Sequence, residues 1–185
     1  EETLSALDIA VTSGRVRYVG VSNYLGWQLA RAFSLQNPLF GKVPITSIQS
    51  EYSLLNRKVE EEVIPASINL EIGFMAWSPL GRGVLTGKYR GGTPSDSRAA
   101  SPHFASFVSP YFDEKSKRIV DAVSVASEGL GYSPLEVALA WVRDSYGVTT
   151  SIVGARTAAQ LRGILTSEEV ELPDQVRAAL DEVSI

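Results

Sequence analysis

The chain contains no cysteine, which excludes a disulfide framework, a thiol nucleophile and a cysteine-bound metal. Positive charge is also scarce, because 17 Lys and Arg face 21 Asp and Glu. The net charge of −4 leaves no global basic field for nucleic acid or an anionic membrane. No apolar run reaches membrane-spanning length, and the first residues, EETLSALDIA, do not resemble a signal peptide. We therefore expect a cytoplasmic globular protein with neither nucleic acid nor membrane as a partner.

Methionine is nearly absent as well, since Met75 is the only one and the chain opens on Glu1. A translated chain starts with methionine unless that residue is removed, usually ahead of a small residue. We therefore expect this chain to be a piece of a longer protein. Its 185 residues, 44% of them hydrophobic, suffice for one domain with a substantial core.

A glycine-rich stretch, WSPLGRGVLTGKY over 77–89, is similar to a phosphate-binding P-loop but departs from it twice. Three residues, not four, separate Gly83 from Gly87, and Tyr89 after the lysine cannot act as the Ser/Thr ligand of magnesium. Two interpretations stay open. The loop could hold a phosphate on backbone N–H groups, with Arg82 or Lys88 adding charge, or it could be a close-packed turn that binds nothing.

Hydrophobic periodicity predicts helices that alternate with strands. Leu4, Leu7 and Val11 recur at helical spacing, and Gly14 should end that helix. The acidic run at 60–62 should be a solvated first helical turn. Residues 90–113, which lack a period, should form a long loop that is either functional or disordered. We expect strands over 15–23, 45–56, 73–77 and 149–155, and further helices over 27–35, 58–70, 114–128, 133–144, 157–165 and from 174 onward.

Strands alternating with helices predict an α/β protein with a parallel sheet, whose ligands lie at the carboxyl ends of the strands. Polar residues follow these ends, and they include hydroxyls, amides and the cations Arg82, Lys88 and Arg156. The mixture favours an anionic ligand such as a nucleotide. No G-x-G-x-x-G follows a strand, so a Rossmann-type site is not expected. The loops are Ser22-Asn23, Gln49 to Tyr52, Ser78 to Lys88, and Gly154 to Gln160.

The motifs RVRYVGVSNY, IQSEYSLLNR, AWSPLGRGVLTGKY and IVGARTAAQL, in that order, resemble the aldo-keto reductase family. The resemblance extends over nearly the whole chain and is closest to bacterial oxidoreductases with the SPLGRG-LTGK loop. It implies a (β/α)8 barrel of the TIM type that binds a nicotinamide cofactor, usually NADPH, in extended form. Residues 1–185 would be a single domain covering roughly strands five to eight, the C-terminal half of the barrel.

The resemblance also implies roles for the loop residues. Trp77 would stack on the nicotinamide ring and leave its other face open for hydride transfer. The pyrophosphate would be wrapped by the loop after it, with Lys88 nearby. The remaining assignments are Ser22, Asn23 and Gln49 for the nicotinamide carboxamide, Ser78, Pro79, Leu80, Gly81 and Arg82 for the pyrophosphate, and Gly154, Arg156 and Gln160 for the adenosine ribose and its 2′-phosphate.

Two departures accompany the resemblance. The family often has asparagine four residues after the position of Gln160, where this chain has Ile164. This departure affects the residues expected to contact the adenine end of the cofactor, and with them the expected preference for NADP over NAD. The family's catalytic aspartate, tyrosine, lysine and histidine belong to the first half of the barrel, so we assign no catalytic residue here. His103, the only histidine, should be solvated in the long loop.

The resulting hypothesis is an oxidoreductase that reduces a small aldehyde or ketone to an alcohol with NAD(P)H, for which this chain supplies most of the cofactor site. The alternative is a non-catalytic nucleotide-binding or interaction module, since channel-associated subunits share this fold. Trp77 could also be ordinary core, Ser22-Asn23 only a helix cap, and Gln49 a polar residue of the barrel interior. An isolated half-barrel exposes sheet edges, so the missing N-terminal half or a second copy is an expected partner.

Overall fold

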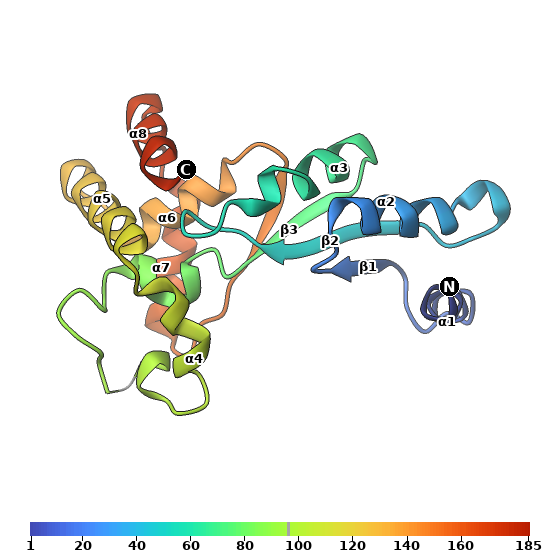
Figure 1. Ribbon diagram of the computed structural model, residues 1–185, viewed down its shortest axis with the longest axis horizontal. Coiled ribbons are helices and arrows are strands. Elements are labelled where there is room, and N and C mark those ends of the chain that lie inside the picture. Colours follow the sequence, from blue (N-terminus) through green and yellow to red (C-terminus); the bar gives the residue numbers. More distant parts are fainter. Residues whose placement is uncertain (96) are drawn as a thin grey trace. The chain divides into compact units, whose positions relative to one another are not determined.

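The computed structural model describes residues 1–95 and 97–185 of the chain (Figure 1). Internal contacts divide these residues into two compact units. The first unit comprises residues 1–51, 58–76 and 146–150, and the second comprises 52–57, 77–145 and 151–185.

The first unit is organised around a sheet whose strands lie in the order β1-β2-β3-β4. β1 and β2 are parallel, with Ser22 opposite Gln49, which agrees with the predicted parallel α/β fold. Close approach of these strands requires Gly20, because a Cβ there would lie 2.2 Å from the Ser47 hydroxyl oxygen. The strands are β1 Val19–Ser22, β2 Ile45–Glu51, β3 Gly73–Trp77 and β4 Val148–Ile152.

Two helices of the first unit, α2 and α3, pack against each other (Figure 1). A carboxylate oxygen of Glu62 accepts a hydrogen bond from the backbone nitrogen of Trp27, at 2.7 Å, in the first turn of α2. That nitrogen lacks a partner within its own helix, and the helix dipole favours a carboxylate at this end. The helices of this unit are α1 Glu2–Thr12, α2 Gly26–Leu35 and α3 Val63–Asn69.

The prediction of one continuous helix over 58–70 was therefore wrong, although Glu61 and Glu62 of the acidic run are exposed as expected. The segment forms a 3-10 turn, Lys58–Glu60, and then α3, which begins only at Val63. Glu62 precedes α3 and stabilises the neighbouring helix instead of its own first turn. A tertiary contact thus replaced the local pattern.

The last four helices of the second unit lie where they were predicted, whereas the short helix before them lies within 90–113, which was expected to be a loop. Side chains cap the first turns of three of these helices: Asp113, Ser133 and Thr157 each accept a hydrogen bond from a backbone nitrogen three residues later. Gly131 ends α5 in the left-handed conformation, with φ of 76°. The helices are α4 Ala105–Val108, α5 Glu114–Leu130, α6 Pro134–Arg143, α7 Ala158–Thr166 and α8 Asp174–Ser184.

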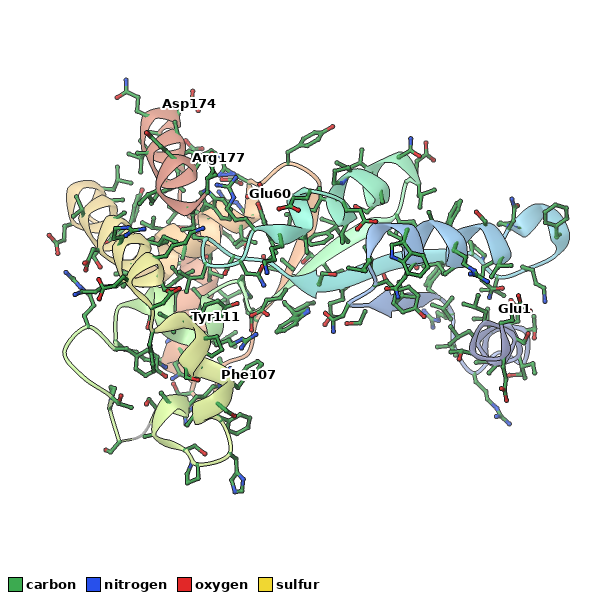
Figure 2. The ribbon with its side chains drawn as sticks, viewed as in Figure 1. Glu1, Glu60, Phe107, Tyr111, Asp174 and Arg177 are labelled. Atoms are coloured by element: carbon green, nitrogen blue, oxygen red, sulfur yellow. The ribbon has the colours of Figure 1, made fainter. Side chains whose placement is uncertain are left out.

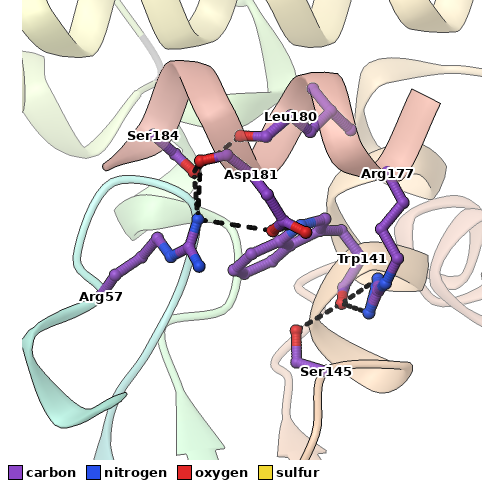
Figure 3. A network of polar contacts seen from close by, with 7 residues as sticks. All are labelled: Arg57, Trp141, Ser145, Arg177, Leu180, Asp181 and Ser184. Carbon is purple, nitrogen blue, oxygen red and sulfur yellow. Dashed lines mark hydrogen bonds and ion pairs between the residues drawn. The ribbon is translucent and has the colours of Figure 1, made fainter. Parts of the chain in front are cut away.

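The core of the second unit includes Trp141, whose side chain is 1% exposed. Its indole nitrogen donates to a carboxylate oxygen of Asp181 on α8, at 2.9 Å. Arg57 donates to the Ser184 hydroxyl and to the Asp181 carbonyl, and Arg177 donates to the Trp141 carbonyl (Figure 3). This network ties α8 to α6 and to the turn at 52–57.

Other predicted segments end earlier than expected. The second strand stops at Glu51, because Ser53 and Asn56 exchange backbone hydrogen bonds in a tight turn. Residues 90–113 contain short helical turns, including η4 Arg98–Ala100 and η5 Ser109–Tyr111, which hydrophobic periodicity did not predict. No helix within the described part of the chain is long and apolar enough to span a membrane.

Candidate functional site

The second unit contains a cavity of about 390 Å³ at the ends of β3 and β4. Trp77, the last residue of β3, lines this cavity and is half-buried, which disfavours the interpretation of Trp77 as ordinary core. Its backbone carbonyl accepts a hydrogen bond from Tyr52. The predicted site residues that line the cavity are Trp77, Ser78, Pro79, Leu80, Arg82, Lys88, Gly154, Arg156 and Gln160.

The glycine-rich loop turns sharply because several of its residues adopt left-handed backbone conformations. Ser78, Gly81, Arg82 and Gly83 all have positive φ, between 53° and 91°. At Gly81 an added Cβ would lie 2.5 Å from the Leu55 side chain, so this glycine permits close packing and does not line the cavity. Gly83, by contrast, lines the cavity.

The cavity wall is strongly cationic. Arg82, Lys88, Arg98 and Arg156 contribute to it, and no Asp or Glu does so among the described residues. Fixed positive charge without a compensating carboxylate favours an anionic ligand. Arg98 was missed by the sequence analysis, because it lies in a segment without hydrophobic period and only the path of that segment brings it to the cavity.

The loop after β4 is held by its own hydrogen bonds. The side-chain oxygen of Gln160 accepts from the Arg156 backbone nitrogen at 2.8 Å, while the Thr157 hydroxyl caps α7 by accepting from the Gln160 nitrogen at 3.2 Å. Hydrogen bonds within residues 156–160 therefore hold the loop that places Arg156 at the cavity.

Apolar side chains complete the cavity. Leu135, Ile152, Val153 and Ile164 line it together with the polar groups. Ile164 is only 7% exposed, so its side chain contributes to both the cavity wall and the core of this unit. A ligand with both a charged part and a flat apolar part fits such a lining.

The predicted carboxamide residues lie in the first unit, where the ends of β1 and β2 bring them together. The Ser22 hydroxyl and the Asn23 backbone nitrogen both donate to the Gln49 carbonyl, at 3.1 and 2.8 Å. Asn23 is left-handed, with φ of 58°. The helix-cap interpretation of these residues was wrong, because α2 is preceded by Leu25, whose nitrogen donates to the side chain of Gln28.

His103 is exposed, and no group of three or more His, Asp or Glu side chains is placed to hold a metal ion in residues 1–95 and 97–185.

Comparison with known proteins gives a consistent result. The chain is 34% identical to the uncharacterized oxidoreductase YrpG of Bacillus subtilis, over 99% of this chain and 53% of that protein. It is 32% identical to a probable voltage-gated potassium channel subunit beta of Arabidopsis thaliana, over 99% and 56%. It is 33% identical to the L-glyceraldehyde 3-phosphate reductase of Escherichia coli K12, over 87% and 47%.

The chain thus spans about half the length of the curated relatives it matches. The family resemblance found in its motifs is confirmed, because the profile of the Aldo/keto reductase family matches residues 1–185, the whole of the sequence. The chain belongs to the aldo/keto reductase family.

Proposed function

We propose that this chain binds a nicotinamide dinucleotide for the NAD(P)H-dependent reduction of aldehydes or ketones to alcohols. One observation carries the proposal: a cationic cavity with Trp77 at its wall, in a chain of the aldo/keto reductase family. A dinucleotide suits this cavity because its phosphates match the cationic side chains and its flat rings match the apolar ones.

The cationic residues are proposed to hold the phosphates. Lys88 and Arg98 would neutralise the pyrophosphate, which the turn at 78–83 approaches with its backbone. Arg156 would bind the ribose 2′-phosphate, which is the reason to propose NADP in preference to NAD.

At the other end of the dinucleotide, Trp77 would cover one face of the nicotinamide ring. Ser22, Asn23 and Gln49 offer a hydroxyl and amides that suit the carboxamide. The bound dinucleotide would supply the hydride, and stacking on Trp77 would fix the orientation of the ring.

The proton donor is proposed to lie outside this chain, in the part of the relatives that it does not span. A tyrosine with an ordinary pKa near 10 needs a neighbouring cation to donate its proton efficiently at neutral pH. We assign that role to no residue of this chain. The substrate would be a small carbonyl compound, and a cytoplasmic location remains part of the proposal because of the cysteine-free composition.

A second function, nucleotide binding without turnover, is kept because one relative is named as a probable potassium channel subunit beta. Oxidation of NADPH by the full-length protein with 4-nitrobenzaldehyde would distinguish the two. Turnover supports the enzyme, whereas tight NADPH binding without turnover supports the module.

The direct test is a titration of the chain with NADPH and NADH, followed by tryptophan fluorescence. We expect saturable quenching, and in Trp77→Ala an affinity about tenfold lower. Trp27 and Trp141 remain as reporters in this variant. The dinucleotide proposal is wrong if neither this chain nor the full-length protein binds either nucleotide.

A further inference from the structure

Arg82 lines the nucleotide cavity, yet its guanidinium is engaged by the segment at 98–111. Its Nη1 donates a hydrogen bond to the backbone carbonyl of Phe107. The guanidinium carbon also lies 3.8 Å from the centroid of the Phe107 ring and 4.9 Å from that of Tyr111. Figure 2 labels both aromatic residues on the part of the chain that carries α4 and η5. One guanidinium thus joins the glycine-rich loop to two turns of this segment.

The backbone conformation of Arg82 also indicates that its side-chain contacts matter for the structure. Its φ of 60° and ψ of 23° are left-handed, between Gly81 and Gly83, which are also left-handed. An arginine in this conformation is strained, whereas glycine would adopt it readily. The contacts with Phe107 and Tyr111 offset this strain, since stacking and a charge-assisted hydrogen bond are both favourable.

The engaged segment carries a cation of the cavity. Arg98 opens η4, and α4 packs against both η4 and the glycine-rich loop. A second link lies nearby, because the Tyr89 hydroxyl accepts a hydrogen bond from the Ala99 backbone nitrogen at 3.4 Å. The position of Arg98 therefore depends on how this segment is attached to the loop.

We propose that Arg82 is a positioning residue that clamps residues 98–111 onto the glycine-rich loop and so holds Arg98 at the cavity. Lys88, Arg98 and Arg156 would then bind the phosphates. The Arg82 side chain, first expected to contact the pyrophosphate, would instead hold residues 98–111 against the loop. The effect on nucleotide binding rests on the proposed function, whereas the clamp itself does not.

Amide hydrogen exchange of the ligand-free chain tests the clamp. In Arg82→Gln, exchange across 98–111 should rise by about fivefold or more, and NADPH should bind about tenfold more weakly. The matched control is Lys88→Gln, which removes a cation from the same cavity. It should weaken NADPH binding to a similar degree while leaving exchange at 98–111 unchanged.

Two further variants separate positioning from charge. Arg82→Lys keeps the charge but lacks the planar guanidinium, so it should restore neither exchange protection nor affinity. Phe107→Leu removes a ring that does not line the cavity among the described residues. It should nevertheless raise exchange at 98–111 and weaken NADPH binding by about threefold.

Unchanged exchange at 98–111 in both Arg82→Gln and Phe107→Leu would overturn the clamp, as would full rescue by Arg82→Lys. Exchange within α5 serves as the folding check, and if Arg82→Gln fails it, Phe107→Leu decides. Should neither the wild-type chain nor the full-length protein bind a nucleotide, the proposed function fails, while the exchange data still decide the clamp.

Discussion

The backbone nitrogen of Arg156 donates a hydrogen bond to the side-chain oxygen of Gln160, at 2.8 Å, and Gln160 lies in the first turn of α7. The backbone nitrogen of Gln160 donates a hydrogen bond to the Thr157 hydroxyl. Hydrogen bonds within residues 156–160 therefore hold the loop that presents Arg156. Such preorganisation raises affinity because less entropy is lost on binding.

Removing this support should weaken nucleotide binding. Gln160→Ala deletes the acceptor for the Arg156 nitrogen, and we expect the NADPH dissociation constant to rise by about five- to tenfold, since one hydrogen bond contributes ~1 kcal/mol. Fluorescence titration measures the change. Arg162→Ala on the same helix is the control and should bind as the wild type does, because Arg162 does not line the cavity among the described residues. Equal affinities in Gln160→Ala and the wild type would contradict the supporting role.

Ile164 is expected to make the adenine end of the site permissive. An apolar wall does not discriminate between bases by hydrogen bonding, so the wild type should bind NADPH and its hypoxanthine analogue with affinities within about threefold. Ile164→Asn adds an amide and should raise the discrimination to about tenfold or more.

Competitive titration with the two nucleotides measures this ratio, and Ile164→Val controls for the lost volume. Strong discrimination by the wild type would show that the base is recognised by polar groups other than residue 164.

The contact of Asp181 with Trp141 should stabilise the second unit. In Asp181→Ala the buried indole N–H loses its acceptor, and we expect the free energy of unfolding to fall by about 1–3 kcal/mol. Asp181→Asn keeps an oxygen acceptor and should lose less. Urea denaturation of both variants tests this, and equal losses would indicate that the carboxylate charge near Arg57, at 3.4 Å, matters more than the hydrogen bond.

The cap of α6 should make stability depend on pH. The hydrogen bond from the Ser133 side chain holds the pKa of Glu136 below its ordinary value. A pKa lowered in the folded state means that this stabilisation is complete above the unfolded pKa, about 4.3, and is lost as pH falls through the lower folded value.

Ser133→Ala should therefore lower the free energy of unfolding by about 1 kcal/mol at pH 7 and by less at pH 3. Urea denaturation at both pH values, with Glu136→Gln as the variant that cannot titrate, measures the difference. A penalty for Ser133→Ala that is the same at both pH values would exclude the carboxylate as its source.

Local patterns were sufficient for much of the fold. The strand at 73–77 and the helices at 114–128, 133–144 and 157–165 were predicted from local sequence patterns, which act within one or two turns of chain. The prediction over 58–70 was wrong because Glu62 bonds to a nitrogen 35 residues away, and no local pattern contains such a contact.

The sequence by itself determined the alternation of strands and helices, the family, and the loops that follow the strands. Tertiary structure decided which side chains of those loops meet. Arg98 reaches the cavity, and Arg82 contacts Phe107, because of the path taken by residues 97–113 and a left-handed backbone at Arg82. Hydrophobic periodicity predicts only regular helices and strands, so it gives no information about a segment that lacks such periodicity. Nor does it predict a strained arginine that is held in place by aromatic rings distant in the sequence.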